Sequence, residues 1–223
     1  NKQTMESAIV KFGDKLNKDT VGLFYYSGHA VQYKGSNYLV PIGSVAQVNK
    51  VEDLPSSTVA ANLILDKLEG SLSKLNFVFL DSCRDNPFAN LGNQITPGLA
   101  KTEGGSDSNA LGLPDLAKGM FTSRGITKER VKLKKDTTGT LVAYSTMPGK
   151  VASDGSGRNS PYTKHLLERI KEPNALVQIM LSDVMQAVEK ETDGKQIPIY
   201  EAAISGRFCF KSVDNQCGKT INI

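Results

Sequence analysis

Two side chains capable of nucleophilic chemistry lie at the ends of two apolar segments. His29 closes the segment 21–30, which has the composition of a buried strand, and Cys83 closes a second apolar segment that begins at residue 76. Ligands of open α/β sheets bind just beyond the carboxyl ends of the strands, where an imidazole and a thiol delivered in this way can meet. A thiol beside an imidazole is an activated nucleophile. The sequence therefore predicts a Cys-His hydrolase.

Each of these residues also has an ordinary structural explanation. A lone cysteine after an apolar strand is usually a small buried hydrophobe, and His29 could be a strand-end histidine satisfied by hydrogen bonds. His165, the second of the two histidines, lies in a predicted helix and is expected at the surface. It is the alternative candidate for the catalytic base.

Composition favours one α/β domain over 1–223, because 223 residues with 39% hydrophobic content can bury a sizeable core. No apolar run approaches the ~20 residues that span a bilayer, so we expect no membrane insertion. The net charge of +4 is small and is concentrated in 128–135, which argues against nucleic-acid binding. No Cys or His spacing of the zinc type occurs, and we expect no metal and no cofactor.

The other two cysteines, Cys209 and Cys217, have no histidine near them in sequence and are not expected to be catalytic. They either form a disulfide that closes a short C-terminal loop or remain free thiols, and the sequence favours neither. A disulfide would indicate an oxidising compartment, and the protein would then be a soluble periplasmic or secreted protein. Free thiols would instead suit a soluble cytoplasmic protein. The chain begins without a signal-peptide pattern, and its localisation stays open.

The predicted order of elements is helix, strand, hairpin, helix, strand, loop, strand, two helices and strand. The first helix spans 4–16, with Ala8, Ile9, Phe12 and Leu16 at helical spacing. A hairpin with a Gly-Ser turn follows over 32–41. Ser57 or Thr58 is expected to cap the next helix, which carries Leu63, Ile64 and Leu68. Helices between strands imply parallel pairing.

The second half begins with a long polar stretch over 89–138, which we expect to be a mobile surface loop. A strand from residue 141 restores the apolar pattern. Ser160 and Pro161 suit the start of a helix, and Asn174 is expected to cap another. The apolar face of that last helix is predicted to comprise Leu176, Ile179, Met180, Val184 and Val188. The final strand is expected over 199–210.

Three motifs together resemble the caspase-like cysteine peptidases (peptidase C14), most closely the bacterial orthocaspases and metacaspase-like proteins. They are Tyr-Ser-Gly-His-Ala at 26–30, Asp-Ser-Cys-Arg-Asp-Asn-Pro-Phe at 81–88, and Tyr-Ser-Thr-Met-Pro-Gly at 144–149. The histidine lies about 50 residues before the cysteine, as in caspases. The resemblance runs from the first helix to the last strand. It implies a three-layer α/β/α sandwich with a mostly parallel central sheet and a thiol endopeptidase activity.

The resemblance also assigns roles to individual residues. Cys83 is the nucleophile and His29 the acid and base, and the backbone N–H groups of Cys83 and Ala30 bind the oxyanion. Most relatives have glycine where this chain has Ala30, which matters if the position requires positive φ. Asp81, Asp154 and Ser145 are assigned to substrate binding.

Charge suggests the substrate preference. Caspases that cut after aspartate have glutamine and arginine where this chain has Asp81 and Asp154. An acidic pocket would attract arginine, and as a second option lysine, in protein or peptide substrates. In the alternative, structural explanation, Asp81 caps the strand-end turn and Asp154 belongs to a Ser-Asp-Gly turn.

Basic residues in 89–138 make self-processing there a hypothesis, although a solvated basic loop is open to any trypsin-like activity.

The N-terminal strands of the family's sheet are absent from this chain. A missing N-terminal segment or a second chain could complete the sheet, or the sheet is small with an exposed edge. Glu52, Asp53 and Asp85 form no recognisable calcium-binding pattern.

Two other functions compete with the peptidase. One is a non-enzymatic interaction module with a caspase-like fold, which the intact His29 and Cys83 argue against. The other is a thiol amidase or acyltransferase acting on small molecules. Asp81 and the basic loop favour the peptidase over it.

Overall fold

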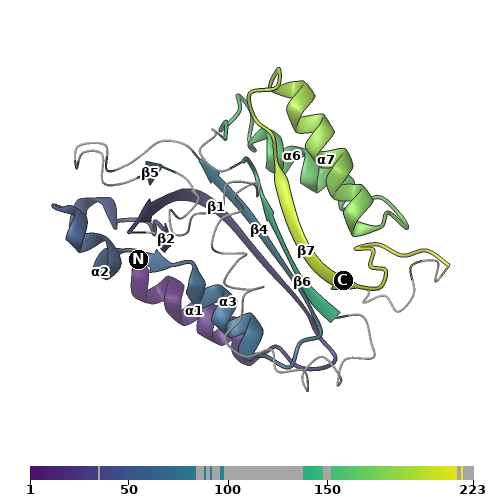
Figure 1. Ribbon diagram of the computed structural model, residues 1–223, viewed down its shortest axis with the longest axis horizontal. Helices are drawn as coiled ribbons and strands as arrows, with labels where there is room; N and C mark the ends of the chain where they lie inside the picture. Colours follow the sequence, from purple (N-terminus) through teal and green to yellow (C-terminus); the bar gives the residue numbers. More distant parts are fainter. Residues whose placement is uncertain are drawn as a thin grey trace, which may run out of the picture.

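A central sheet separates two layers of helices in the computed structural model, which describes residues 1–34, 36–83, 88, 91, 96–97, 138–147, 152–214 and 217. The long strands are β1 (Val21–Tyr33), β4 (Leu75–Cys83), β6 (Thr138–Tyr144) and β7 (Ile199–Ser205). β1, β4 and β6 run parallel to one another, and β7 lies antiparallel beside β6 (Figure 1). The expected α/β sandwich with a mostly parallel central sheet is confirmed.

The predicted hairpin is also confirmed. β2 (Ser36–Leu39) pairs antiparallel with the last four residues of β1, so that Tyr33 lies opposite Ser36 and Ala30 opposite Leu39. β3 (Val59–Ala60) extends this part of the sheet, and β5 (Thr96–Pro97) pairs with β1. Among the described strands, residues 21–29 of β1 have a partner on one side only, which is β4.

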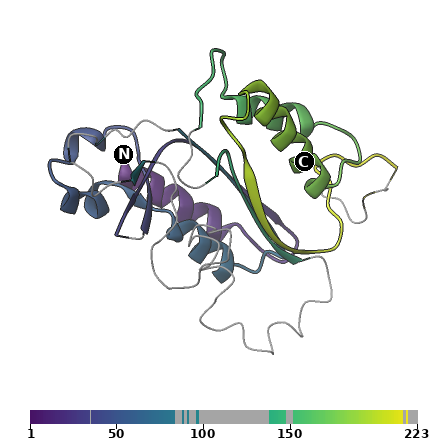
Figure 2. The same cartoon turned by 45° about the horizontal axis from the view of Figure 1, so that its top comes forward.

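Helices α1 (Lys2–Asp14) and α3 (Asn62–Gly70) cover one face of the sheet (Figure 1, Figure 2). α1 begins earlier than expected because the side chain of Asn1 caps it, accepting a hydrogen bond from the N–H of Thr4 at 3.0 Å. Ala8 is exposed and does not join the core. The buried cluster between these helices and the sheet includes Ile9, Ile64, Leu65, Leu68, Val78, Leu80 and Val142.

The expected cap of α3 at Ser57 or Thr58 is wrong. Two single turns, η1 (Val45–Gln47) and η2 (Val51–Asp53), lead into the short helix α2 (Leu54–Ser57). Thr58 ends α2, because both its backbone N–H and its hydroxyl donate to the carbonyl oxygen of Leu54. The chain then forms β3, and α3 starts only at Asn62. Sequence periodicity located the helix but not this intervening turn.

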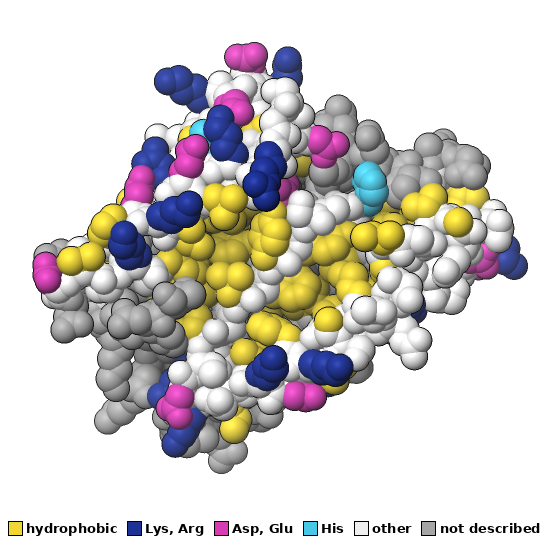
Figure 3. Space-filling model, turned by 180° about the vertical axis from the view of Figure 1, so that it is seen from behind, with side chains coloured by type: hydrophobic (Ala, Val, Ile, Leu, Met, Phe, Trp, Pro, Cys, Tyr) yellow, Lys and Arg dark blue, Asp and Glu magenta, His cyan; other side chains and the backbone are white. Residues whose placement is uncertain are grey.

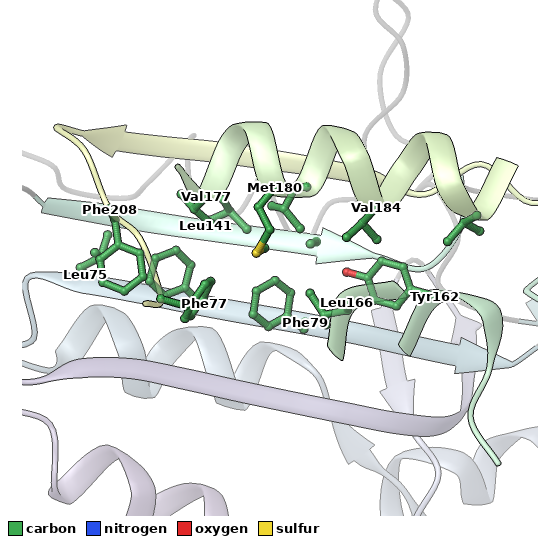
Figure 4. Packing of buried hydrophobic residues seen from close by; sticks show 14 residues of the cluster. Leu75, Phe77, Phe79, Leu141, Tyr162, Leu166, Val177, Met180, Val184 and Phe208 are labelled. Atoms are coloured by element: carbon green, nitrogen blue, oxygen red, sulfur yellow. The ribbon is translucent and has the colours of Figure 1, made fainter. Parts of the chain in front are cut away.

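Helices α6 (Pro161–Arg169) and α7 (Val177–Glu191) cover the other face of the sheet. Figure 4 shows side chains of β4, β6, α6 and α7 packed between the sheet and these two helices. Ser160 caps α6 as predicted, accepting from the N–H of Thr163 at 3.0 Å. Asn174 does not cap α7, since its side chain accepts from the N–H of Val213 instead. Ile179 is 57% exposed and lies outside the core. The cluster includes Phe77, Phe79, Leu141, Tyr162, Leu166, Met180, Leu181 and Val184.

The segment after β7 folds back onto this second cluster. Phe208 and Phe210 pack on Phe77 with ring centroids 4.7 Å and 5.0 Å away. Between them, Cys209 forms a disulfide with Cys217, with 5.8 Å between the two Cα atoms. Of the two alternatives for these cysteines, the disulfide is therefore the one present in the structure.

Most of the segment 89–138, for which the sequence predicts a mobile loop, lies outside the described residues. Its described part contributes β5 to the sheet. In the portion of the chain that the structure describes, no helix is both long and apolar enough to cross a membrane.

Glu201 is a buried carboxyl group within the sheet. It lies on β7 opposite Val142, and its Oε1 atom has no hydrogen-bond partner among the described residues. Burial raises the pKa of Glu201 to about 7. Burial and the nearby Glu201 charge both raise the pKa of Tyr144. Ionised Glu201 is therefore unfavourable in the folded protein.

We expect the stability of the Glu201→Gln variant to depend less on pH than that of the wild type between pH 4.5 and about pH 7. The unfolded chain releases the Glu201 proton near its ordinary pKa of 4.5 and the folded chain only near 7, so the wild type loses stability as the pH rises through this window. Thermal unfolding at pH 5 and pH 8 measures the effect. The variant should lose less stability than the wild type over this interval, and an equal loss in both proteins would contradict the assignment.

Candidate active site

The pairing of β1 with β4 determines where the two candidate catalytic residues lie. In this parallel ladder His29 is directly opposite Cys83, and Ser27 is directly opposite Asp81. Residues at every second position of a strand share a face, so His29, Ser27 and Asp81 lie on the face that α6 and α7 cover. The backbone of Cys83 is described as the last residue of β4, while its side chain lies outside the described part of the structure. The structure thus brings the two backbone positions together at one strand end.

His29 is held through its backbone rather than its ring. Its carbonyl oxygen accepts hydrogen bonds from the Tyr26 hydroxyl at 2.6 Å and from the N–H of Val40 at 3.0 Å. A Cβ atom at Gly28 would lie 2.8 Å from the Tyr26 hydroxyl oxygen, so glycine leaves room for this contact. The ring is half-buried, and its Nδ1 atom has no hydrogen-bond partner among the described residues. Among the described residues, no third side chain orients the imidazole through Nδ1.

The peptide group between His29 and Ala30 has an orientation that its hydrogen bond to β2 determines. Its carbonyl oxygen points to Val40 beside β2, and in a trans peptide the N–H points the opposite way. The N–H of Ala30 therefore points away from β2, toward the side on which β4 and Cys83 lie. The Ala30 side chain is buried with Leu39 in the α1/α3 cluster. Ala30 is not among the described residues with positive φ, so its methyl group causes no backbone strain.

Asp81 is fully buried and joins the end of β4 to the start of α6. Its Oδ2 atom accepts hydrogen bonds from the hydroxyls of Ser160, at 2.5 Å, and Thr163. The Thr163 hydroxyl also lies 2.6 Å from the Tyr25 hydroxyl. The second carboxyl oxygen, Oδ1, is buried and has no described partner. Sequence analysis identified Ser160 only as a helix cap, and it missed Thr163 and Tyr25, whose roles depend on packing between distant segments.

The buried phenol of Tyr162 lies close enough to Asp81 for the two groups to interact electrostatically. Burial raises the pKa of Tyr162 most, and the Asp81 and Tyr25 groups raise it further. The Tyr162 hydroxyl has no hydrogen-bond partner among the described residues. The Tyr162 hydroxyl and the Asp81 carboxyl group are thus two buried polar groups that lie close to each other.

Ser145 and Asp154 lie in the segment between β6 and α6. Ser145 is buried, its N–H donates to the carbonyl oxygen of Leu80 at 2.9 Å, and its hydroxyl has no described partner. Asp154 is exposed. The side chain of Gln196, which sequence analysis also missed, donates to the carbonyl oxygen of Ser145 at 2.8 Å. Ser145 is therefore next to the end of β4, since Leu80 directly precedes Asp81.

His165, the alternative base, occupies a different environment. Its Nε2 atom lies 2.6 Å from the carboxylate of Glu191 and its Nδ1 atom 3.2 Å from that of Glu168. Lys164 also pairs with Glu191 at 2.8 Å. The hydrogen bonds from Lys164 and from His165 lower the pKa of Glu191. Both ring nitrogens of His165 are thus engaged in a hydrogen-bond network that links α6 to α7. In the described ranges, no group of three or more His, Cys, Asp and Glu residues could hold a metal ion.

Comparison with known proteins places the chain in a family. The profile of the caspase domain family matches residues 1–209. None of the curated proteins matches the sequence significantly. Among solved structures, caspase-1 from Spodoptera frugiperda is similar with 15% sequence identity and a TM-score of 0.46, over 95% of this chain and 73% of that one. A protein from Geobacter sulfurreducens is similar with 14% identity and a TM-score of 0.47, over 98% and 76% of the two chains. The match over residues 1–209 shows that this chain belongs to the caspase domain family of C14 peptidases.

Proposed function

We propose that this chain is a cysteine endopeptidase that cleaves peptide bonds after arginine and, as a second option, lysine. Cys83 is the nucleophile and His29 transfers protons. The observation that carries the proposal is the register of β1 and β4, which sets His29 directly opposite Cys83 at one strand end. Membership of a cysteine peptidase family supports the same chemistry.

The proposed reaction begins when the Cys83 thiolate attacks the carbonyl carbon of the scissile peptide bond. The N–H groups of Cys83 and Ala30 stabilise the oxyanion of the tetrahedral intermediate. His29 donates a proton to the leaving amine, which gives a thioester that water then hydrolyses. The orientation of the peptide between His29 and Ala30 supports the role of the Ala30 N–H.

Asp81 is the proposed basis of the preference for basic residues. The hydroxyls of Ser160 and Thr163 fix one carboxylate oxygen and leave Oδ1 without a described partner. A guanidinium group that reaches this buried oxygen would form a charge-assisted hydrogen bond, which is stronger than a neutral one. Ser145 and Asp154 are proposed to contact the substrate from the segment after β6. This acidic site favours the metacaspase-like branch of the family, which includes the bacterial orthocaspases.

The edge of β1 supports a proposal about partners. Residues 21–29 of β1 lack a second strand among the described residues, and Leu23 and Tyr25 on this strand are 37% and 41% exposed. Seen from behind, the molecule has a hydrophobic area at the centre of its surface with charged side chains around it (Figure 3). An N-terminal segment or a second chain that adds a strand here would cover these side chains. The Cys209–Cys217 disulfide supports an oxidising compartment.

The first test measures cleavage of matched fluorogenic peptides ending in arginine, lysine or aspartate, with and without calcium. We expect cleavage after arginine or lysine, and a loss of more than ~10³-fold in the Cys83→Ala and His29→Asn variants. His165→Gln is the matched histidine control and should retain activity. Silence from folded wild type would favour the interaction module. Hydrolysis confined to small amides would favour the thiol amidase.

Asp81→Asn tests the specificity. The variant keeps an oxygen that can accept from Ser160 and Thr163 but loses the charge, so we expect kcat/KM for the arginine peptide to fall about 10- to 100-fold, as for a lost charged hydrogen bond. Thermal unfolding checks that α6 remains docked. Unchanged cleavage after arginine, or wild-type cleavage after aspartate, would contradict the role of Asp81.

Self-processing within 89–138 is the third expectation of the proposal. Purified wild type should yield fragments cut after basic residues in this segment, and Cys83→Ala should remain intact under the same conditions. Gel electrophoresis and intact-mass measurement identify the cut positions. The same fragments from both proteins would show that another protease makes them.

A further inference from the structure

Gln196 is a buried polar residue that joins two segments of the candidate site. It lies between α7 and β7 and is 1% exposed. Its Nε2 atom donates to the carbonyl oxygen of Ser145 at 2.8 Å, and its Oε1 atom accepts from the N–H of Ser153 at 2.9 Å. Only one orientation of the amide satisfies both partners, because one is an acceptor and the other a donor. The side chain is therefore fixed at both ends.

The position of Gln196 is fixed in turn by α7. The Thr192 hydroxyl at the end of α7 accepts from the backbone N–H of Gln196 at 3.1 Å and donates to the carbonyl oxygen of Val188 at 2.8 Å. α7 packs on β4 and β6 through Met180, Leu181 and Val184. Gln196 thus connects the segment after β6 to a rigid part of the core.

Both partners of Gln196 adjoin residues proposed to bind substrate. Ser145 is one of these residues, and its N–H reaches Leu80, which precedes Asp81. Ser153 directly precedes Asp154. One buried amide therefore sets the spacing between two points of the segment that follows β6.

We infer that Gln196 is a positioning residue, which holds the substrate-binding segment at Ser145 and at Ser153 and Asp154 in place beside the end of β4. The inference rests on the proposed peptidase function and adds a specificity-determining element to it. Without the amide, the carbonyl group of Ser145 and the N–H group of Ser153 lose their buried partners, and the segment shifts until other partners satisfy them. Misplacement of this kind weakens substrate binding more than it changes the reactivity of Cys83.

The experiment compares Gln196→Met and Gln196→Glu with the wild type and with Gln186→Met, a control at an exposed glutamine of α7. kcat and KM are measured with the arginine peptide, and the rate of Cys83 alkylation by iodoacetamide reports the thiol without the substrate-binding segment. Gln196→Met should raise KM at least 10-fold, with the alkylation rate within twofold of wild type. Gln196→Glu keeps the acceptor for Ser153 but places a carboxylate oxygen against the carbonyl oxygen of Ser145, so it should also raise KM at least 10-fold. Gln186→Met should behave as wild type.

The possible failures are distinct. Unchanged KM in both Gln196 variants, with wild type active on the arginine peptide, overturns the inference and leaves the proposed function intact. An equal fall in alkylation rate and kcat/KM shows a general structural role and also overturns it. Wild type that is folded but inactive on basic peptides removes the proposed function and this inference with it. If thermal unfolding shows that Gln196→Met does not fold, Gln196→Glu decides by the same criteria.

Discussion

The candidate active site depends on the parallel pairing of β1 with β4. This ladder sets His29 opposite Cys83 and Ser27 opposite Asp81, so two groups far apart in sequence end at one sheet edge. A shift of one residue in the register would turn every side chain of one strand to the other face. The apolar residues of β4 on both faces oppose such a shift, because Phe77 and Phe79 pack under α7 while Val78 and Leu80 pack under α1 and α3.

The buried carboxyl group of Asp81 connects this ladder to the second helical layer. A buried carboxyl group is costly unless hydrogen bonds compensate it, and here two hydroxyls from the first turn of α6 do so. The cap of α6, the carboxyl group and the end of β4 therefore form one unit. The remaining oxygen of Asp81, Oδ1, is buried and has no hydrogen-bond partner among the described residues.

Much of this arrangement could be predicted from the sequence, because apolar segments that end in His29 and Cys83 carry a strong local signal. The α/β fold, the hairpin and the Ser160 cap of α6 were predicted correctly because each depends on residues that are neighbours in sequence. The predictions failed where tertiary contacts override local preference: Thr58 ends a short helix, and Asn174 binds Val213 instead of capping α7. Thr163, Tyr25 and Gln196 could not be found in advance, since their partners are distant in sequence.

The Ser160 hydroxyl has two roles that limit which residues can replace it. It accepts from the N–H of Thr163 to cap α6, and it donates its proton to Asp81. Aspartate and asparagine are equally good helix caps in general. Aspartate has no proton to donate here, however, and would place a second carboxylate against the first. Asparagine would have to present its oxygen to the helix and its NH₂ group to Asp81 from a longer side chain, in a space where one hydroxyl oxygen makes both contacts. The start of α6 therefore requires a hydroxyl residue. Aspartate or asparagine, which stabilise helix N-termini in most proteins, would destabilise this one, whether they arise by natural mutation or by design.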